Sequence, residues 1–340
     1  MKKRLSLFVL VTLVSLSFAQ NTFNLFTWPE YIDPEIISQF EETFDVEVTV
    51  DLFDSNEEAL GKLQAGSLGL YDVVIITNYA IPIFASQGML QELDHAQLPN
   101  LSNLDAKFID PSFDPGNSYS IAYQWGTTGL AYRADLVDEA PTSWDVIFNP
   151  DSKASFTLID DMRPMIGHAL LYLGYNYNSQ DAGELTAARD LLIDAKERSL
   201  GFYGSVKSAE FLLTGEAQYA IVYTGDALQA ADEDENIKYV IPQEGAEIWV
   251  DSMTLLKDAP NPEMAYAFMN YILEAEIGGQ LTNWVYYPSP NAAAYDFIDE
   301  EIRANPVIFL SAEEQARLDY TLDVENLELY DLIWTQVKSR

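Results

Sequence analysis

Hydrophobic and polar positions along the chain predict strands and helices in alternation. Apolar runs bounded by turn residues predict strands at 23–27, 46–53, 71–77, 219–224 and 237–242. Apolar positions at helical spacing predict helices at 34–43, 56–63, 162–173 and 182–199. The run YDVVIIT is apolar almost throughout, which is typical of a strand buried on both faces, and the runs at 219–224 and 237–242 share this character. The alternation favours open, mostly parallel sheets covered by helices.

The length of the chain indicates two such α/β units. One parallel sheet is not expected to hold the roughly 320 residues that follow the N-terminal segment. Extended stretches at 120–133 and 247–256 are long enough to run from one lobe into the other. The prediction is therefore a two-lobed α/β protein with a cleft, and clefts between domains are favoured ligand sites.

The first 19 residues have the pattern of a secretory signal peptide. Lys2, Lys3 and Arg4 precede an apolar run at 5–16, and Ser17-Phe18-Ala19 fits a cleavage site. The run is too short to span a bilayer, and no later stretch approaches transmembrane length. The chain has no cysteine, which excludes disulfides, thiol catalysis, iron–sulfur clusters and a lipoprotein anchor. We expect an exported protein that is free in the periplasm.

The net charge and the absence of catalytic motifs exclude several classes of function. The formal net charge is −36, from 54 acidic and 18 basic residues, and it becomes −39 without Lys2, Lys3 and Arg4. Such a surface repels phosphate, which argues against nucleic acid, and attracts cations. It is also compatible with a purely solubilising role. His95 and His168 lack metal-ligand spacing and are expected to be structural. No nucleophile elbow, Walker loop or dinucleotide fingerprint is present.

Acidic and aromatic residues recur just after predicted strands. They are Trp28, Glu30 and Tyr31; Thr77 and Tyr79; Asp160 and Asp161; Tyr223 and Asp226; Trp249 and Asp251; and Tyr286 and Tyr287. In open α/β sheets, ligands bind beyond the carboxyl ends of strands. Helix N-capping is an alternative role for Asp161 and Asp226. Asp251 is harder to explain in that way, because aspartate is depleted inside strands.

Carboxylates among aromatic rings match one class of ligand. An ammonium group donates charge-assisted hydrogen bonds to carboxylates, and it is attracted to an aromatic face by about 0.5–2 kcal/mol per contact. Methylene chains pack against the same rings. The residues therefore indicate a flexible organic polycation, namely a diamine or polyamine.

The chain resembles the periplasmic polyamine-binding proteins, of spermidine/putrescine type, that serve ABC importers. The resemblance runs from residue 22 to about 335 and rests on TWPEY, YDVVIITNY, LSNLD, DPGNSYSIAYQWGTTGLAY, SWDVIFNP, LIDDMR, GEAQYAIVYTGDA, IPQEGAEIWVDSM and YYPSPNAAA. It implies a monomeric type II periplasmic-binding-protein fold that closes over the polyamine, with no catalysis, no cofactor and no metal, and with a membrane permease as partner. The implied lobes are 20–126 with 250–295, and 127–249 with 296–340, with hinges near Gly126, Val250 and Tyr295.

The resemblance also implies roles for individual residues. Trp28, Tyr223, Trp249 and Tyr287 correspond to an aromatic box around the methylene chain. Glu30, Tyr31, Thr77 and Tyr79 correspond to the group around one terminal amine, Asp161 and Asp251 to buried acids, and Ser205 to a minor polar contact.

Three departures from the family pattern leave the choice of polyamine open. Pro164 stands where spermidine-type members have a glutamate, and Asp226 stands where they tend to have serine and putrescine-type members aspartate. No glutamine occurs in its expected place at 318–323. This pattern is compatible with putrescine as the ligand, and also with spermidine bound at a position shifted along the cavity. A same-fold receptor or sensor for another solute, and a secreted hydrolase with a carboxylate pair, are the rival functions.

Overall fold

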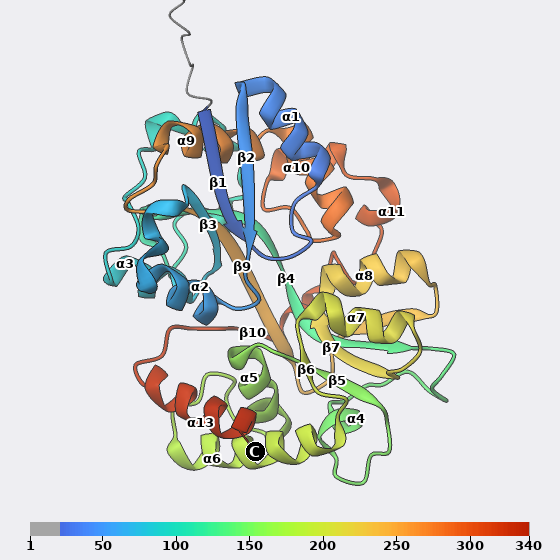
Figure 1. Cartoon of the computed structure of the whole chain (residues 1–340). Helices are drawn as coiled ribbons and strands as arrows, with labels where there is room; N and C mark the ends of the chain where they lie inside the picture. Colours follow the sequence, from blue (N-terminus) through green and yellow to red (C-terminus); the bar gives the residue numbers. More distant parts are fainter. Residues whose placement is uncertain (1–20, 340) are drawn as a thin grey trace, which may run out of the picture.

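The computed structural model describes residues 21–339, so the predicted signal peptide lies outside the described residues. Figure 1 shows two α/β lobes, one above the other, with two long strands running between them. The strands form one continuous sheet in the order β2-β1-β3-β9-β4-β7-β5-β6, with β10 beside β9 and β8 beside β4. The predicted two-lobed α/β architecture is confirmed.

The N-terminal lobe, at the top of Figure 1, is built on three parallel strands. These are β1 (Asn21–Thr27), β2 (Val46–Leu52) and β3 (Val73–Thr77). Its helices are α1 (Pro34–Phe44), α2 (Asn56–Lys62), α3 (Ala80–Ser86), α9 (Pro262–Ile272) and α10 (Ala275–Val285). The short helix α11 (Glu300–Arg303) follows α10 in the chain. The predicted start of α1 is confirmed: the Asp33 side chain accepts a hydrogen bond from Glu35 N at 2.9 Å, and Pro34 is the first helical residue.

The C-terminal lobe contains the remaining short strands and the longest helix. Its strands are β5 (Phe156–Ile159), β6 (Phe202–Tyr203), β7 (Tyr219–Tyr223), β8 (Ile237–Val240) and β10 (Leu318–Tyr320). Its helices are α4 (Asp145–Phe148), α5 (Met162–Tyr172), α6 (Ala182–Arg198), α7 (Ser205–Leu213), α8 (Thr224–Glu233), α12 (Ala312–Gln315) and α13 (Leu327–Ser339).

Two long strands, β4 (Ser120–Arg133) and β9 (Ala246–Leu255), connect the lobes and pair antiparallel with each other. β9 also pairs with β3 through residues 251–255 and with β10 through residues 246–248. β4 also pairs with β7 and β8. Every residue of both strands is buried. The predicted passage of these two stretches through both lobes is thus confirmed.

Each lobe has its own hydrophobic core. One large cluster combines residues from Phe23 to Tyr123 with residues from Trp249 to Tyr287. A second combines residues from Leu130 to Ile221 with Ala246 and residues of the C-terminal helix. The exact lobe boundaries and the hinge residues stay predictions.

The strand interpretation of 237–242 needs a correction. β8 was expected to be buried on both faces, but Lys238 is exposed while Ile237 and Tyr239 are buried. The reason is its position at the side of the lobe, where it pairs with β4 in antiparallel fashion and has one solvated face. β3, in contrast, is buried at all five positions, as expected.

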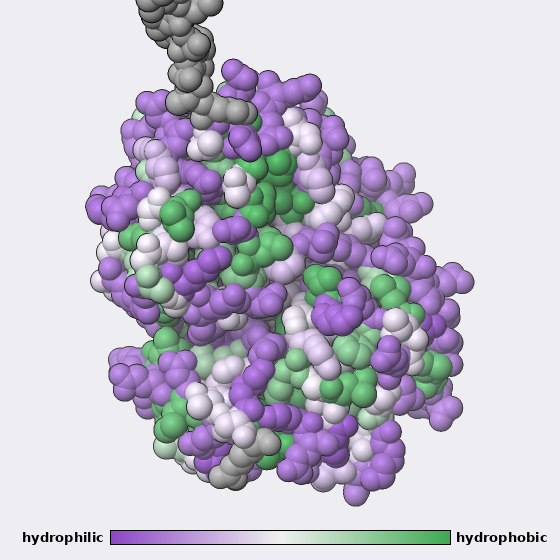
Figure 2. Space-filling view, in the orientation of Figure 1, coloured by the Kyte–Doolittle hydropathy of each residue, from purple (hydrophilic) through white to green (hydrophobic). Residues whose placement is uncertain are grey.

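Much of the surface is hydrophilic (Figure 2). Figure 2 shows hydrophilic residues over much of the visible face, with hydrophobic residues between them. Within residues 21–339, no helix combines the length and the apolar character that crossing a membrane requires.

Candidate functional site

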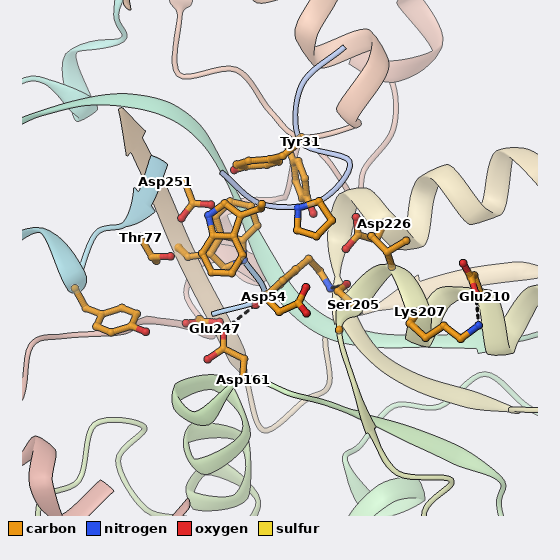
Figure 3. A pocket seen from close by; sticks show the side chains of 18 residues that line it. Tyr31, Asp54, Thr77, Asp161, Ser205, Lys207, Glu210, Asp226, Glu247 and Asp251 are labelled. Carbon is orange, nitrogen blue, oxygen red and sulfur yellow. Dashed lines mark hydrogen bonds and ion pairs between the residues drawn. The ribbon is translucent and has the colours of Figure 1, made fainter. Parts of the chain in front are cut away.

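A cavity of about 230 Å³ lies between the two lobes and is lined by residues from both (Figure 3). Eleven of the twelve predicted site residues line it: Trp28, Tyr31, Thr77, Tyr79, Asp161, Ser205, Tyr223, Asp226, Trp249, Asp251 and Tyr287. The other lining residues are Pro29, Asp54, Gly204, Val206, Lys207, Glu210 and Glu247. The structure therefore brings nearly the whole predicted set together.

Four aromatic side chains form a connected wall. Trp28 follows β1 and packs its ring 6.3 Å from the ring of Tyr223, measured between centroids. The Tyr223 ring lies 5.9 Å from that of Trp249, which lies 5.0 Å from that of Tyr287. All three pairs are close to perpendicular, so both faces and edges of the rings are presented. This wall can pack against an alkyl chain and attract a cation.

Two glycines make room for this wall. A Cβ atom at Gly126 would lie 2.7 Å from the Trp249 ring and 2.9 Å from the Tyr287 ring. A Cβ atom at Gly225 would lie 2.4 Å from the Tyr287 ring. Gly126 is the register partner of Trp249 on β4, so the missing side chain is what allows the indole to lie across the sheet.

Asp251 lies at one end of the cavity, beside Thr77 and Tyr31 (Figure 3). Thr77 on β3 is its register partner, which places both side chains on the same face of the sheet. Burial raises the pKa of Asp251 to about 7, although the hydroxyl groups of Thr77 and Tyr31 oppose the shift. Within residues 21–339, its Oδ1 atom is buried without a hydrogen-bond partner. One oxygen of this carboxyl group is therefore free to accept a hydrogen bond from a ligand.

Tyr79 is held in place by side chains of α2. Asn56 Nδ2 donates to the hydroxyl of Tyr79 at 3.1 Å and to Thr77 Oγ1 at 2.9 Å. The Tyr79 hydroxyl in turn donates to Glu57 Oε1 at 3.0 Å. This network fixes the orientation of Thr77 and Tyr79 at the cavity wall.

Asp161 both caps a helix and lines the cavity. Its side chain accepts a hydrogen bond from Arg163 N at the start of α5, as the capping alternative predicted. Its Oδ2 atom also accepts a hydrogen bond from the Tyr223 hydroxyl at 2.7 Å. Burial, followed by the negative charges of Glu57 and Glu247, raises the pKa of Asp161 well above its ordinary value. Helix capping and a place in the cavity wall are therefore compatible roles for Asp161.

Asp226 is not a cap, so that alternative is wrong for it. It lies inside the first turn of α8, whose N-cap position is Tyr223. Its side chain points toward the cavity beside Ser205 (Figure 3). Burial raises its pKa to about 7, against the opposing effect of the Ser205 hydroxyl. Asp226 thus places a second buried carboxyl group at the other side of the cavity from Asp251.

Glu30 is the one predicted site residue that does not line the cavity. It is exposed in the turn after β1, with a left-handed backbone at φ 48°. Its charge still acts on the site, because it raises the pKa of Asp226.

The sequence interpretation missed Asp54 and Glu247. Asp54 comes shortly after β2 and carries the same signal as Trp28, a functional side chain beyond a strand end. Glu247 precedes Trp249 and Asp251 at spacing two on β9, so strand alternation places all three on one face. Lys207 and Glu210 form an exposed ion pair on α7 at the cavity rim.

Neither histidine lines the cavity, although Glu247 N donates a hydrogen bond to His168 Nε2 at 3.4 Å. His168 is buried and stacks on Trp144 with 4.4 Å between ring centroids, and burial lowers its pKa to about 3. His95 Nε2 is 2.8 Å from Asn117 O. In the part of the chain from 21 to 339, no group of His, Asp and Glu is arranged to hold a metal ion.

Comparisons with known proteins agree with this geometry. A family model for bacterial extracellular solute-binding proteins matches residues 35–309. A putrescine/agmatine-binding protein of Pseudomonas aeruginosa is 35% identical, over 94% of this chain and 93% of its own length. A putrescine/cadaverine-binding protein of the same species is 34% identical over the full length of both chains.

A solved structure shows the same likeness in three dimensions. It comes from Listeria monocytogenes and is provisionally assigned to a spermidine/putrescine ABC transporter. It has a TM-score of 0.88 and 31% identity, over 94% of this chain and 99% of that one. With the family model covering most of the sequence, the chain belongs to the bacterial extracellular solute-binding proteins.

Proposed function

We propose that this protein is a periplasmic receptor that binds a linear polyamine, putrescine or spermidine, in the cavity between its lobes and delivers it to an ABC importer. The observation that carries the proposal is the cavity itself, where the aromatic wall of Trp28, Tyr223, Trp249 and Tyr287 lies among buried carboxyl groups. An ammonium group can donate charge-assisted hydrogen bonds to the carboxylates and lie against the aromatic faces, and a methylene chain can pack against the rings.

The electrostatics of the cavity favour a cation over a neutral solute. Asp161, Asp226, Glu247 and Asp251 are all buried, and burial raises the pKa of each. The rise means that ionising these groups in the empty cavity is costly. A bound dication or trication removes that cost, whereas a sugar or other neutral solute leaves it in place.

Transport requires a change that a membrane permease can detect. The cavity is lined by residues of both lobes, so a ligand that contacts Trp28 on one side and Asp161 on the other links the two. Binding is expected to hold the lobes together, and the closed receptor is the form that the permease engages. The predicted signal peptide would place the receptor in the periplasm, without a lipid anchor.

Calorimetric titration of the chain from Gln20 onward tests the proposal. Putrescine, cadaverine, spermidine and spermine are compared at two salt concentrations, because non-specific attraction to the acidic surface weakens with salt. We expect one-to-one binding that survives the higher salt. Asp251→Asn should weaken it, whereas Glu235→Gln removes one exposed charge outside the cavity and should not. Heat that disappears at high salt, or equal effects of both variants, would contradict the proposal.

A further inference from the structure

Glu247 is a buried carboxyl group in the cavity to which the family resemblance assigns no role. It lies on β9, two residues before Trp249 and four before Asp251, and it is 3% exposed. Figure 3 shows it beside Asp161, below Thr77 and Asp251 in this view. We call Glu247 and Asp161 together the cavity floor.

The sheet register explains why the two floor residues meet. Thr128 on β4 is the register partner of Glu247 on one side and of Tyr223 on the other, so the three side chains form one row across the sheet. The Tyr223 hydroxyl then reaches Asp161 Oδ2 at 2.7 Å. The floor is thus built by the strands and by the N-terminus of α5, which are rigid elements.

The hydrogen bonds of Glu247 leave it able to bind a cation. Thr128 Oγ1 donates to Oε2 at 2.5 Å, and Thr321 Oγ1 donates to Oε1. The Tyr177 hydroxyl also lowers the pKa of Glu247 as a hydrogen-bond donor. The two carboxylate oxygens have four acceptor positions in all, so at least one stays free. Thr321 belongs to the segment 318–323, where the family's glutamine is missing, and here its hydroxyl holds Glu247 instead.

Within residues 21–339, no direct ion pair neutralises the cavity floor. Neither Asp161 nor Glu247 forms an ion pair with a lysine or arginine of residues 21–339. The Arg163 guanidinium donates to Asn178 Oδ1 and Leu322 O instead, although its charge lowers the pKa of Glu247 somewhat. Burial raises the pKa of both floor groups, and the Glu247 charge adds to the rise for Asp161. A buried, uncompensated carboxylate pair is costly unless a cation or protons neutralise it.

We propose that the floor is a third cation site, in which Glu247 supplies the carboxylate that Pro164 does not, and that this site makes the receptor select a triamine over a diamine. Asp251 and Asp226 each take one ammonium group, and Glu247 with Asp161 takes a third. A diamine fills two of these sites and leaves the floor uncompensated. This inference rests on the proposed function, because it specifies the ligand of the same cavity.

The test compares two ligands on two variants. Spermidine and putrescine are titrated into the wild-type protein, Glu247→Gln and the control Glu235→Gln. Glutamine keeps the size of the side chain and an acceptor for one of the two threonine hydroxyls. We expect Glu247→Gln to weaken spermidine binding at least tenfold more than it weakens putrescine binding. Glu235→Gln should leave the ratio of the two affinities unchanged.

A second measurement needs no variant, so it holds even if Glu247→Gln does not fold. Binding heats measured from about pH 4.5 to 7, each in two buffers of different ionisation enthalpy, give the number of protons released. Both amines are fully protonated throughout this range, so released protons come from the protein. The third site predicts that spermidine releases more protons than putrescine does. In Glu247→Gln this excess should decrease.

The outcomes separate the two proposals. A wild-type protein that binds neither amine overturns the proposed function and the third site with it. A protein that binds both amines, but whose selectivity changes less than threefold in Glu247→Gln and whose proton release is equal for both, keeps the proposed function and overturns the third site. Glu247 would then be a structural link between β9, β4 and the C-terminal segment.

Discussion

Single residues in the cavity have two effects, because those that contact a ligand also hold the empty structure together. Trp28 illustrates this: its ring packs 4.6 Å from the Phe53 ring and 6.3 Å from the Tyr223 ring, so it joins the core of one lobe to the surface of the other. Ligand affinity and stability therefore have to be measured side by side for every variant.

Replacing Trp28 by alanine should weaken polyamine binding at least about tenfold. A lost cation–π contact accounts for about 0.5–2 kcal/mol, lost packing adds to it, and 1.4 kcal/mol is a factor of ten. Trp28→Phe keeps an aromatic face and should lose less. Calorimetry measures the affinity, and thermal unfolding without ligand corrects for the lost packing against Phe53. If Trp28→Ala binds like the wild type, the aromatic wall does not contact the ligand.

Asp251→Asn should have opposite effects on binding and on stability. Binding should weaken by about 2–5 kcal/mol, because a buried carboxylate loses its role for an ammonium group. The empty protein behaves differently with pH. The folded pKa of about 7 lies above the ordinary value of 3.8, so the folded state holds more protons between these limits. The stability that protonation contributes is fully present at low pH and is lost as the pH rises from about 4 to 7.

Asparagine cannot ionise and does not suffer this loss. The melting temperature of Asp251→Asn relative to wild type should therefore rise between pH 5 and pH 8 in the absence of ligand. Differential scanning at both pH values measures it. A constant difference across this range would mean that Asp251 ionises freely in the empty cavity.

Residue identities in the site were predictable where a chemical type followed a strand end. Trp28, Asp161 and Asp226 are such cases. Trp249 and Asp251 also lie inside β9 and were predicted, whereas Glu247 was missed because only its spacing of two from Trp249 shows that it shares their face. The exposed position of Glu30 depends on a left-handed turn that could not be predicted from the neighbouring residues.

At the scale of elements, the cavity depends on the close approach of β4 and β9 to the segment after α10. Hydrophobic periodicity predicted α1, α5 and α6 to within one or two residues at each end. The helices α9, α10 and α13 had no prediction from the sequence. Register could not be predicted, because it depends on pairing between distant strands. An irregularity between Ala122 and Gln124 shifts the pairing of β4 with β9 before it reaches Gly126.

Gly126→Ala tests this close approach. The new Cβ atom would lie 2.7 Å from the Trp249 ring, so the indole must move toward the cavity. We expect a loss of stability of roughly 1–3 kcal/mol and weaker polyamine binding. Gly61→Ala in α2 is the matched control: no atom lies within 4 Å of its Cβ, and alanine there should stabilise by roughly 0.5–1 kcal/mol. Equal effects of the two substitutions would contradict the packing argument.

At the scale of the whole molecule, length and composition predicted two lobes, and the two separate apolar clusters show why the lobes are distinct. The exact cuts between them could not be predicted, because the crossing strands are continuous and fully buried and carry no linker-like composition. The acidic excess of the sequence, with a net charge of −36, adds a general attraction for cations that salt should weaken. Binding in the cavity should depend less on salt, because the carboxyl groups that bind the ligand there are buried.

The pH dependence of binding follows from those buried groups. In the empty cavity burial raises the pKa of Asp226 and of Asp251 to about 7, and a bound ammonium group favours their ionised forms. Protons therefore compete with the ligand below about pH 7. We expect the affinity to rise from pH 5.5 to 8 by at most tenfold per pH unit for each group that titrates, and then to level off until the amines themselves lose protons.

Calorimetry at fixed ionic strength across this range measures the rise, and Asp226→Asn should reduce its slope while lowering the affinity at pH 8. A surface effect would behave differently, because exposed carboxylates near their ordinary pKa of about 4 are ionised throughout this range. An affinity that stays constant between pH 5.5 and 8 would therefore assign the binding energy to exposed charges rather than to the cavity.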